Sequence, residues 1–183
     1  MTTAVIIICV IVFIVFFVQD LANSDDGPSK SRRVSNRSIS RPKIKLRNED
    51  GDPWMDSRNT YIAGLSYYAT KRDVGGFWGY VVNEPDNKVD PKAMAVITVS
   101  GKLLGYIPAK ELKEYRDWCN GMPRPCVGFL YVHGDQLRGR AKILDVSSRE
   151  FLEREFANYL SWVRSHMGER YLPKENKMPH DFE

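Results

Sequence analysis

The chain has 183 residues, a net charge of +4 and 27% charged residues. Its three cysteines and three histidines do not stand at the spacing of a zinc ligand set, and so few cysteines exclude a disulfide framework. We therefore expect no metal and no cofactor. Cys119 and Cys126 are predicted to be buried thiols.

An uncharged apolar stretch opens the chain. Residues 1–19 carry no charged side chain, and residues 4–18 are only Val, Ile, Phe, Ala and one Cys. As a helix they span roughly 28 Å, which covers the hydrocarbon core of a bilayer. A cleaved secretory signal is the alternative, but it needs a basic start and a small-x-small cleavage site, and both are missing. Residues 1–19 are therefore predicted to be a transmembrane helix.

A basic segment follows the apolar stretch. Residues 28–47 contain eight Lys or Arg and no acid. By the positive-inside rule, this excess predicts a single-pass membrane protein whose C-terminal body is cytoplasmic. Residues 20–58 have few large apolar side chains and are predicted to be a disordered linker. Its charge suits either anionic lipid head groups or nucleic acid, and both alternatives stay open.

The sequence becomes β-rich from Asn59 onward. Runs of β-branched and aromatic residues are separated by turn signals such as Ser100-Gly101 and Gly134-Asp135. They predict six strands, at residues 61–70, 77–84, 93–99, 102–107, 126–133 and 137–146.

Two helices are predicted among these strands. Pro108 is expected to open the first, with Leu112, Tyr115 and Cys119 on its buried face and Gly121 at its end.

The second helix is predicted to begin at Ser147, because Ser147 and Glu150 have the spacing of a capping box. It is expected to end at Gly168, and residues 169–183 are expected to form a loose polar tail. One face of this helix carries an apolar stripe: Leu152, Phe156, Tyr159, Leu160, Val163 and Met167. Residues 59–168 are therefore predicted to be one α+β domain, a small closed or half-closed β-barrel of about six strands with two helices.

Catalytic signatures are missing from the sequence. There is no phosphate-binding loop, no GxSxG, no HExxH and no paired CxxC. Carboxylates are scattered along the chain, and no histidine has a nucleophile at a catalytic spacing. We therefore expect a binding protein and not an enzyme.

The pair Tyr67-Tyr68 is a candidate ligand contact. On the predicted strand, adjacent residues face opposite ways, so one ring fills the core while the other is exposed. An exposed ring beside Lys71 and Arg72 could stack on a nucleic-acid base. Ordinary core packing is the alternative explanation of the pair.

The loop at residues 84–93, EPDNKVDPKA, is a second candidate. As a ligand site, it would offer the amide of Asn87 and the carboxylate of Asp90 to a ligand hydroxyl, with Lys88 as a nearby cation. The alternative is a surface turn capped by its own side chains.

A third candidate is the segment LRGRAK, where Arg138, Arg140 and Lys142 alternate with small or apolar residues. The alternation places three cations on one face of a strand. This face is either a solvated surface or a track for phosphates.

Three segments together resemble the HIRAN domain family: YIAGLSYY, NEPDNKVDPKAMAV and GKLLGYIP, in this order. The resemblance covers residues 61–146. It implies a modified OB-like barrel and, from the DNA-repair members, a pocket for the 3′ end of single-stranded DNA. In that pocket Tyr67 and Tyr68 would stack on terminal bases, Asp90 would accept a hydrogen bond from the 3′-hydroxyl, and Asn87 and Tyr106 would line the site.

The chain departs from the family pattern at three positions. Ser66 stands where the DNA-end binders carry a basic residue, Val89 where they tend to have an aromatic one, and Tyr106 where His is frequent. The sequence therefore leaves two functions open. One is a membrane-anchored, non-catalytic module for nucleic acid, in particular single-stranded DNA ends. The other is a membrane-tethered protein-interaction or scaffold domain that has lost the pocket.

Overall fold

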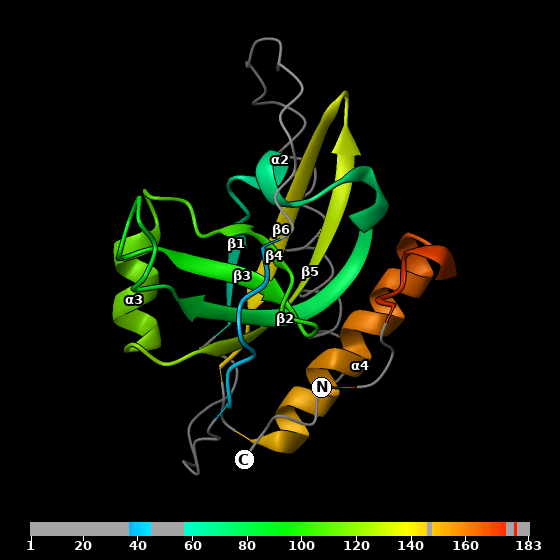
Figure 1. Ribbon diagram of the computed structural model, residues 1–183. Helices are drawn as coiled ribbons and strands as arrows, with labels where there is room; N and C mark the ends of the chain where they lie inside the picture. Colours follow the sequence, from blue (N-terminus) through cyan, green and yellow to red (C-terminus); the bar gives the residue numbers. More distant parts are fainter. Residues whose placement is uncertain (1–36, 45–56, 146–147, 175–177, 179–183) are drawn as a thin grey trace. The chain divides into compact units, whose positions relative to one another are not determined.

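The computed structural model describes residues 37–44, 57–145, 148–174 and 178 (Figure 1). All of them belong to one compact unit, Arg32–Glu183. The predicted transmembrane helix, and linker residues 20–36 and 45–56, lie outside the described residues. Within the described part, no helix is long and apolar enough to cross a membrane.

One antiparallel sheet of six strands forms the body of the domain. Its strands lie in the order β1-β6-β5-β2-β3-β4, so the two hairpins β3–β4 and β5–β6 flank the long strand β2. The hairpins turn at Gly101 and Gly134, both with positive φ, as the turn signals predicted. The strands are β1 (Arg58–Tyr61), β2 (Gly75–Asn83), β3 (Met94–Thr98), β4 (Leu103–Tyr106), β5 (Arg124–His133) and β6 (Gln136–Ile143).

The two residues after β1 connect the opposite edges of this sheet. The N–H of Ile62 donates to the carbonyl of Gly139 in β6 at 3.0 Å. Ala63 and Tyr106, the last residue of β4, exchange two backbone hydrogen bonds of 2.8 and 2.9 Å. The sheet is therefore curled into a half-barrel, which confirms the predicted architecture.

Helices cover both faces of the sheet. On one face, α2 (Leu65–Tyr68) and α3 (Leu112–Cys119) bury Leu65, Leu112 and Tyr115 against the strands. Along the other face lies α4 (Arg149–His166), whose apolar stripe packs on residues of β2, β3 and β5 (Figure 1). In that second core, the rings of Trp78 and Phe156 meet edge to face at 5.2 Å. The buried stripes predicted for the two longer helices are confirmed.

The predicted strand at residues 61–70 is wrong. Pairing stops at Tyr61 and at the bridge of Ala63, and then Gly64 adopts a left-handed conformation with φ of 76°. This turn starts the single helical turn α2, and a 3₁₀ turn, η2 (Lys71–Asp73), follows. Tyr67 and Tyr68 therefore lie on a helix and not on a strand, so their rings do not point to opposite faces of the sheet.

Both predicted helix starts shift along the chain. Pro108 lies in a turn, where its carbonyl accepts from the N–H of Glu111, and α3 begins only at Leu112. At α4, the cap is Ser148 and not Ser147, because the Ser148 hydroxyl accepts from the N–H of Phe151 at 3.1 Å.

Two segments outside residues 59–168 pack on the domain. From the predicted linker, residues 37–39 pair with the start of β4, and Ile44, 1% exposed, lies in the core. From the predicted loose tail, the 3₁₀ turn η3 (Glu169–Tyr171) lays the Tyr171 ring against Phe129, 5.9 Å between ring centroids. The packed body thus extends beyond the predicted domain at both ends.

Candidate functional site

Three tyrosines gather at one end of the half-barrel. On α2, Tyr67 is 40% exposed and Tyr68 is half-buried, with their ring centroids 6.2 Å apart. Tyr68 meets the ring of Tyr106, from the end of β4, edge to face at 5.6 Å. The pairing of Ala63 with Tyr106 brings the chain leading into α2 beside β4. One exposed ring is thus supported by two partly buried ones.

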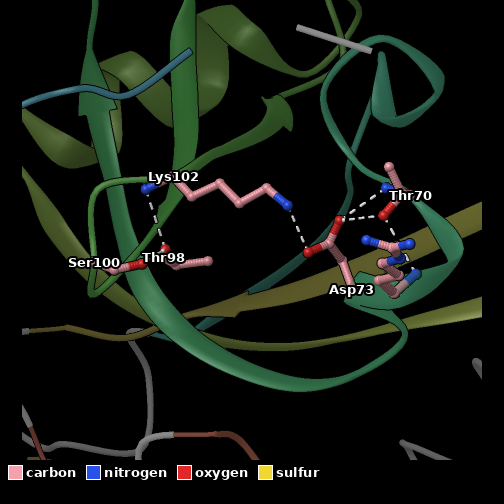
Figure 2. A network of polar contacts seen from close by, with 6 residues as sticks. Thr70, Asp73, Thr98, Ser100 and Lys102 are labelled. Atoms are coloured by element: carbon pink, nitrogen blue, oxygen red, sulfur yellow. Dashed lines mark hydrogen bonds and ion pairs between the residues drawn. The ribbon is translucent and has the colours of Figure 1, made fainter. Parts of the chain in front are cut away.

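A polar network fastens η2, directly after α2, to the β3–β4 hairpin (Figure 2). Lys102 reaches Asp73 with 2.5 Å between Nζ and Oδ1. Asp73 Oδ2 accepts from the N–H and the hydroxyl of Thr70, at 2.8 and 3.0 Å. Burial raises the pKa of Asp73, but the Lys102 ammonium and the Thr70 hydrogen bonds outweigh it, so the net pKa is lowered. The network keeps α2 next to the hairpin that carries Tyr106.

The loop between β2 and β3 is held by its own side chains. Asn87 is buried, and its Oδ1 accepts from the N–H groups of Val89 and Asp90, at 3.0 and 3.2 Å. Asp90 Oδ1 accepts from the N–H of Lys92 at 2.8 Å. The geometry is that of a self-capped turn, the alternative weighed for this loop. Its tip is exposed at Lys88 and at Val89, whose exposed fraction is 94%.

Glu84 joins the loop to the tyrosines, and sequence reasoning missed it. Its side chain is only 7% exposed, and its Oε2 accepts from the Asn87 amide at 3.0 Å. The guanidinium of Arg37 pairs with Oε1 and also donates to the Tyr106 hydroxyl at 3.3 Å. Burial, and then hydrogen bonding to Glu84 and Tyr68, raises the pKa of Tyr106. A buried carboxylate therefore lies at the centre of the site.

The eight predicted site residues are brought together only in part. Tyr67, Tyr68, Tyr106 and Asn87 form one continuous set of contacts around Glu84. The others lie at its borders: Asp90 and Lys88 on the loop, and the exposed Lys71 and Arg72 on η2. The Asn87 amide is used within the loop, which argues against its predicted contact with a ligand.

Two of the three alternating cations of β6 have partners within the domain. The guanidinium of Arg140 lies 4.6 Å from the centroid of the Tyr61 ring and donates to its hydroxyl at 2.8 Å. Lys142 pairs with Glu155 of α4 at 2.7 Å. These contacts favour a structural role for this strand face over a phosphate track.

The two cysteines that the structure describes do not have the properties of a catalytic thiol. Cys119 and Cys126 are buried free thiols, as predicted, and burial raises the pKa of both. Among the residues that the structure describes, no group of three or more His, Cys, Asp or Glu could hold a metal ion.

Comparisons with known proteins give a weak structural similarity. No family model matches the chain, and no curated protein matches it. The crystal structure of the HIRAN domain of human HLTF is similar over 56% of this chain and 84% of that chain, with 18% identity and a TM-score of 0.35. A similarity of this size does not establish a shared ligand. The chain thus resembles the HIRAN family in its motifs and has a HIRAN domain as a structural neighbour.

Proposed function

We propose that this domain binds single-stranded nucleic acid without catalysing a reaction, and that DNA with a free 3′ end is its preferred ligand. The observation that carries the proposal is the exposed ring of Tyr67, which lies against Tyr68, which in turn meets Tyr106. Every base has a flat π face, so an exposed aromatic ring that is held in place by its neighbours can stack on a base of a single strand. Such stacking contributes about 1–3 kcal/mol per base.

Charged groups lie on the two elements next to the tyrosines, which are the turn η2 and the loop between β2 and β3. Lys71 and Arg72 are exposed on the turn that follows α2, where they can contact phosphates. Asp90 uses one carboxylate oxygen for the Lys92 amide, and a carboxylate has further lone pairs for a ligand hydroxyl. In this proposal the tyrosines bind the bases, the cations bind the backbone, and Asp90 binds the terminal hydroxyl.

The proposal includes the membrane. Residues 1–19 would anchor the chain as a single-pass protein, and the basic residues after them would keep the domain cytoplasmic, near anionic lipid. The sequence pattern supports this part of the proposal.

A protein-interaction or scaffold function is the second candidate. The observation that favours it is Glu84, because its carboxylate already holds the guanidinium of Arg37 beside Tyr106, where that cation would otherwise be available to a phosphate. The exposed Val89 at the loop tip also suits a protein partner better than a nucleic acid.

The test is a fluorescence anisotropy titration of the full chain in detergent with labelled oligonucleotides. One oligonucleotide has a free 3′-hydroxyl and the other a 3′-phosphate. We expect tighter binding of the free end, and about tenfold weaker binding by Tyr67→Ala, from the loss of one stacked base. Asp90→Asn should abolish the preference for the free end.

Asp86→Asn is the matched control for Asp90, because Asp86 is an exposed carboxylate in the same loop. It should keep the preference. Equal binding of both oligonucleotides by the unchanged chain would remove the 3′-end proposal. No binding of either at low salt would leave the scaffold function.

A further inference from the structure

Residues 37–39 run antiparallel to the start of β4 and pair with it through one bridge. Ser38 forms an antiparallel bridge with Lys102. The N–H of Ile39 donates to the carbonyl of Gly101 at 2.8 Å, and the N–H of Leu103 donates to the carbonyl of Arg37 at 3.1 Å. Adding an extended segment to a sheet edge is a common mode of peptide recognition, in which backbone hydrogen bonds supply the affinity.

The side chain of Arg37 gives this added strand specificity. Its guanidinium pairs with the buried carboxylate of Glu84 and donates to the hydroxyl of Tyr106. The Glu84 side chain is 7% exposed, so its carboxylate needs a charged partner, because an unpaired buried charge is strongly destabilising. The planar guanidinium fits such a site better than an ammonium, since it offers several donors in a fixed fork. The edge of β4 and Glu84 thus select for an arginine in an extended chain.

The segment is anchored toward its Ile44 end and exposed toward its Arg37 end. Ile44 is buried in the core and Ile39 packs partly against it, whereas Arg37, Ser38 and Ser40 are exposed. The Arg37 side chain keeps 41% exposure even while it is paired. The Arg37 end of the segment therefore lies at the surface, where a peptide that offers the same backbone pairing and guanidinium can compete with it.

We propose that the edge of β4 together with Glu84 is a binding site for an extended, arginine-bearing peptide of a partner protein, which residues 37–39 fill within the same chain. The bound peptide pairs antiparallel with Leu103 and places its arginine on Glu84. The proposal does not rest on nucleic-acid binding, since it uses the strand edge and a carboxylate and needs no exposed tyrosine ring.

The experiment first removes the contacts of residues 37–39 in the full chain, which gives the opened chain, and then adds a peptide that can occupy the same site. Arg37→Ala with Ile39→Pro removes the guanidinium and the N–H that donates to Gly101. The probe is a labelled synthetic peptide of residues 37–44 with blocked ends, followed by anisotropy with the chain in detergent. We expect the opened chain to bind the probe at least about tenfold more tightly than the unchanged chain, where the attached segment competes at high effective concentration.

Two matched controls test the backbone pairing and the preference for arginine. Ser40→Pro places proline next to the pairing without removing the Ile39 donor, and should behave like the unchanged chain. A probe with its arginine changed to lysine should bind the opened chain about tenfold more weakly, because an ammonium does not reproduce the guanidinium that contacts both Glu84 and the Tyr106 hydroxyl. Equal binding of the two probes would overturn the arginine preference, and equal binding by opened and unchanged chains would overturn the site.

Hydrogen exchange of the Leu103 backbone amide gives a second readout of the same site. The amide should exchange faster in the opened chain and be protected again by the probe, because its acceptor is the carbonyl of residue 37. Exchange that is unchanged by opening, or by adding the probe, would overturn the proposal. Oligonucleotide binding that fails while the probe binds would reject the nucleic-acid function alone.

Discussion

The hydroxyl of Tyr159 donates a hydrogen bond to the carbonyl of Gly128 and so joins α4 to the centre of the sheet. The same hydroxyl accepts from the N–H of Phe77 at 3.1 Å, and Phe77 and Gly128 are partners in the register of β2 and β5. One side-chain oxygen therefore satisfies two backbone groups at a buried position. Burial raises the pKa of Tyr159, so the hydroxyl keeps the proton that it donates.

Replacing Tyr159 by Phe should destabilise the domain clearly. The change leaves the N–H of Phe77 and the carbonyl of Gly128 without their shared partner, and unsatisfied buried groups cost about 1–3 kcal/mol each. We expect the free energy of unfolding, measured by urea denaturation, to fall by about 2 kcal/mol. Tyr171→Phe is the control, because Tyr171 contributes its ring to the packing on Phe129. A loss as large in the control would contradict this role of Tyr159.

The ion pair between Lys102 and Asp73 should make stability depend on pH in the acid range. The folded pKa of Asp73 is lowered, so its contribution is present above the ordinary value of 3.8 and is lost as the pH falls through the folded pKa. Lys102→Met should lower the free energy of unfolding by about 1 kcal/mol at neutral pH. The difference from the unchanged chain should shrink below pH 3.8, as followed by urea denaturation at several pH values.

Lys110→Met is the matched control for Lys102, since Lys110 is 78% exposed and lies 3.8 Å from Glu111. Its effect should be within about 0.5 kcal/mol at each pH. A difference between Lys102→Met and the unchanged chain that grows toward acid pH would contradict the lowered pKa of Asp73.

The sequence predicted the sheet well because its signals are local. Alternation and turn glycines such as Gly134 mark the strands, and a regular stripe marks α4. The single helical turn that carries Tyr67 and Tyr68 was not predicted, because four residues are too few to show helical periodicity. The turn does have a signal, which is Gly64 directly before it, in the left-handed conformation that glycine favours.

The site was predicted less completely, because its centre depends on contacts between distant residues. Glu84 and Arg37 are 47 positions apart, and Arg37 lies in a segment whose composition indicates disorder. The packing of Tyr171 on the domain could not be predicted from a sequence pattern either. It needs Gly76, where a Cβ atom would lie 3.0 Å from the Tyr171 carbonyl oxygen and 2.6 Å from the Tyr159 hydroxyl. Pattern reasoning finds the elements, whereas such close approaches follow only from their packing.

Removing one charge of the buried ion pair between Arg124 and Asp145 should destabilise the domain more than removing a charge from an exposed pair. Both side chains are less than 10% exposed, and Arg124 also lies over the Trp118 ring, 5.3 Å from its centroid. Asp145→Asn should lower the free energy of unfolding by about 3–5 kcal/mol, because it leaves a buried guanidinium without its counter-charge. Glu153→Gln, in the exposed pair with Arg149, should cost under about 0.5 kcal/mol in the same urea experiment. Similar losses in the two variants would contradict this difference.

The salt dependence of oligonucleotide binding should identify the phosphate contacts. If Lys71 and Arg72 contact the backbone of a single strand, each releases counterions, and the logarithm of the binding constant falls with the logarithm of salt by about 0.7 per contact. Changing both residues to Gln should therefore reduce the slope by about 1.4 and weaken binding of all sequences alike. The control is the same double change at Lys110 and Lys113, two exposed lysines at α3, which should leave the slope unchanged. A slope that is equal in all three chains would place the phosphates away from η2, and the basic residues of the linker would then be the next to change.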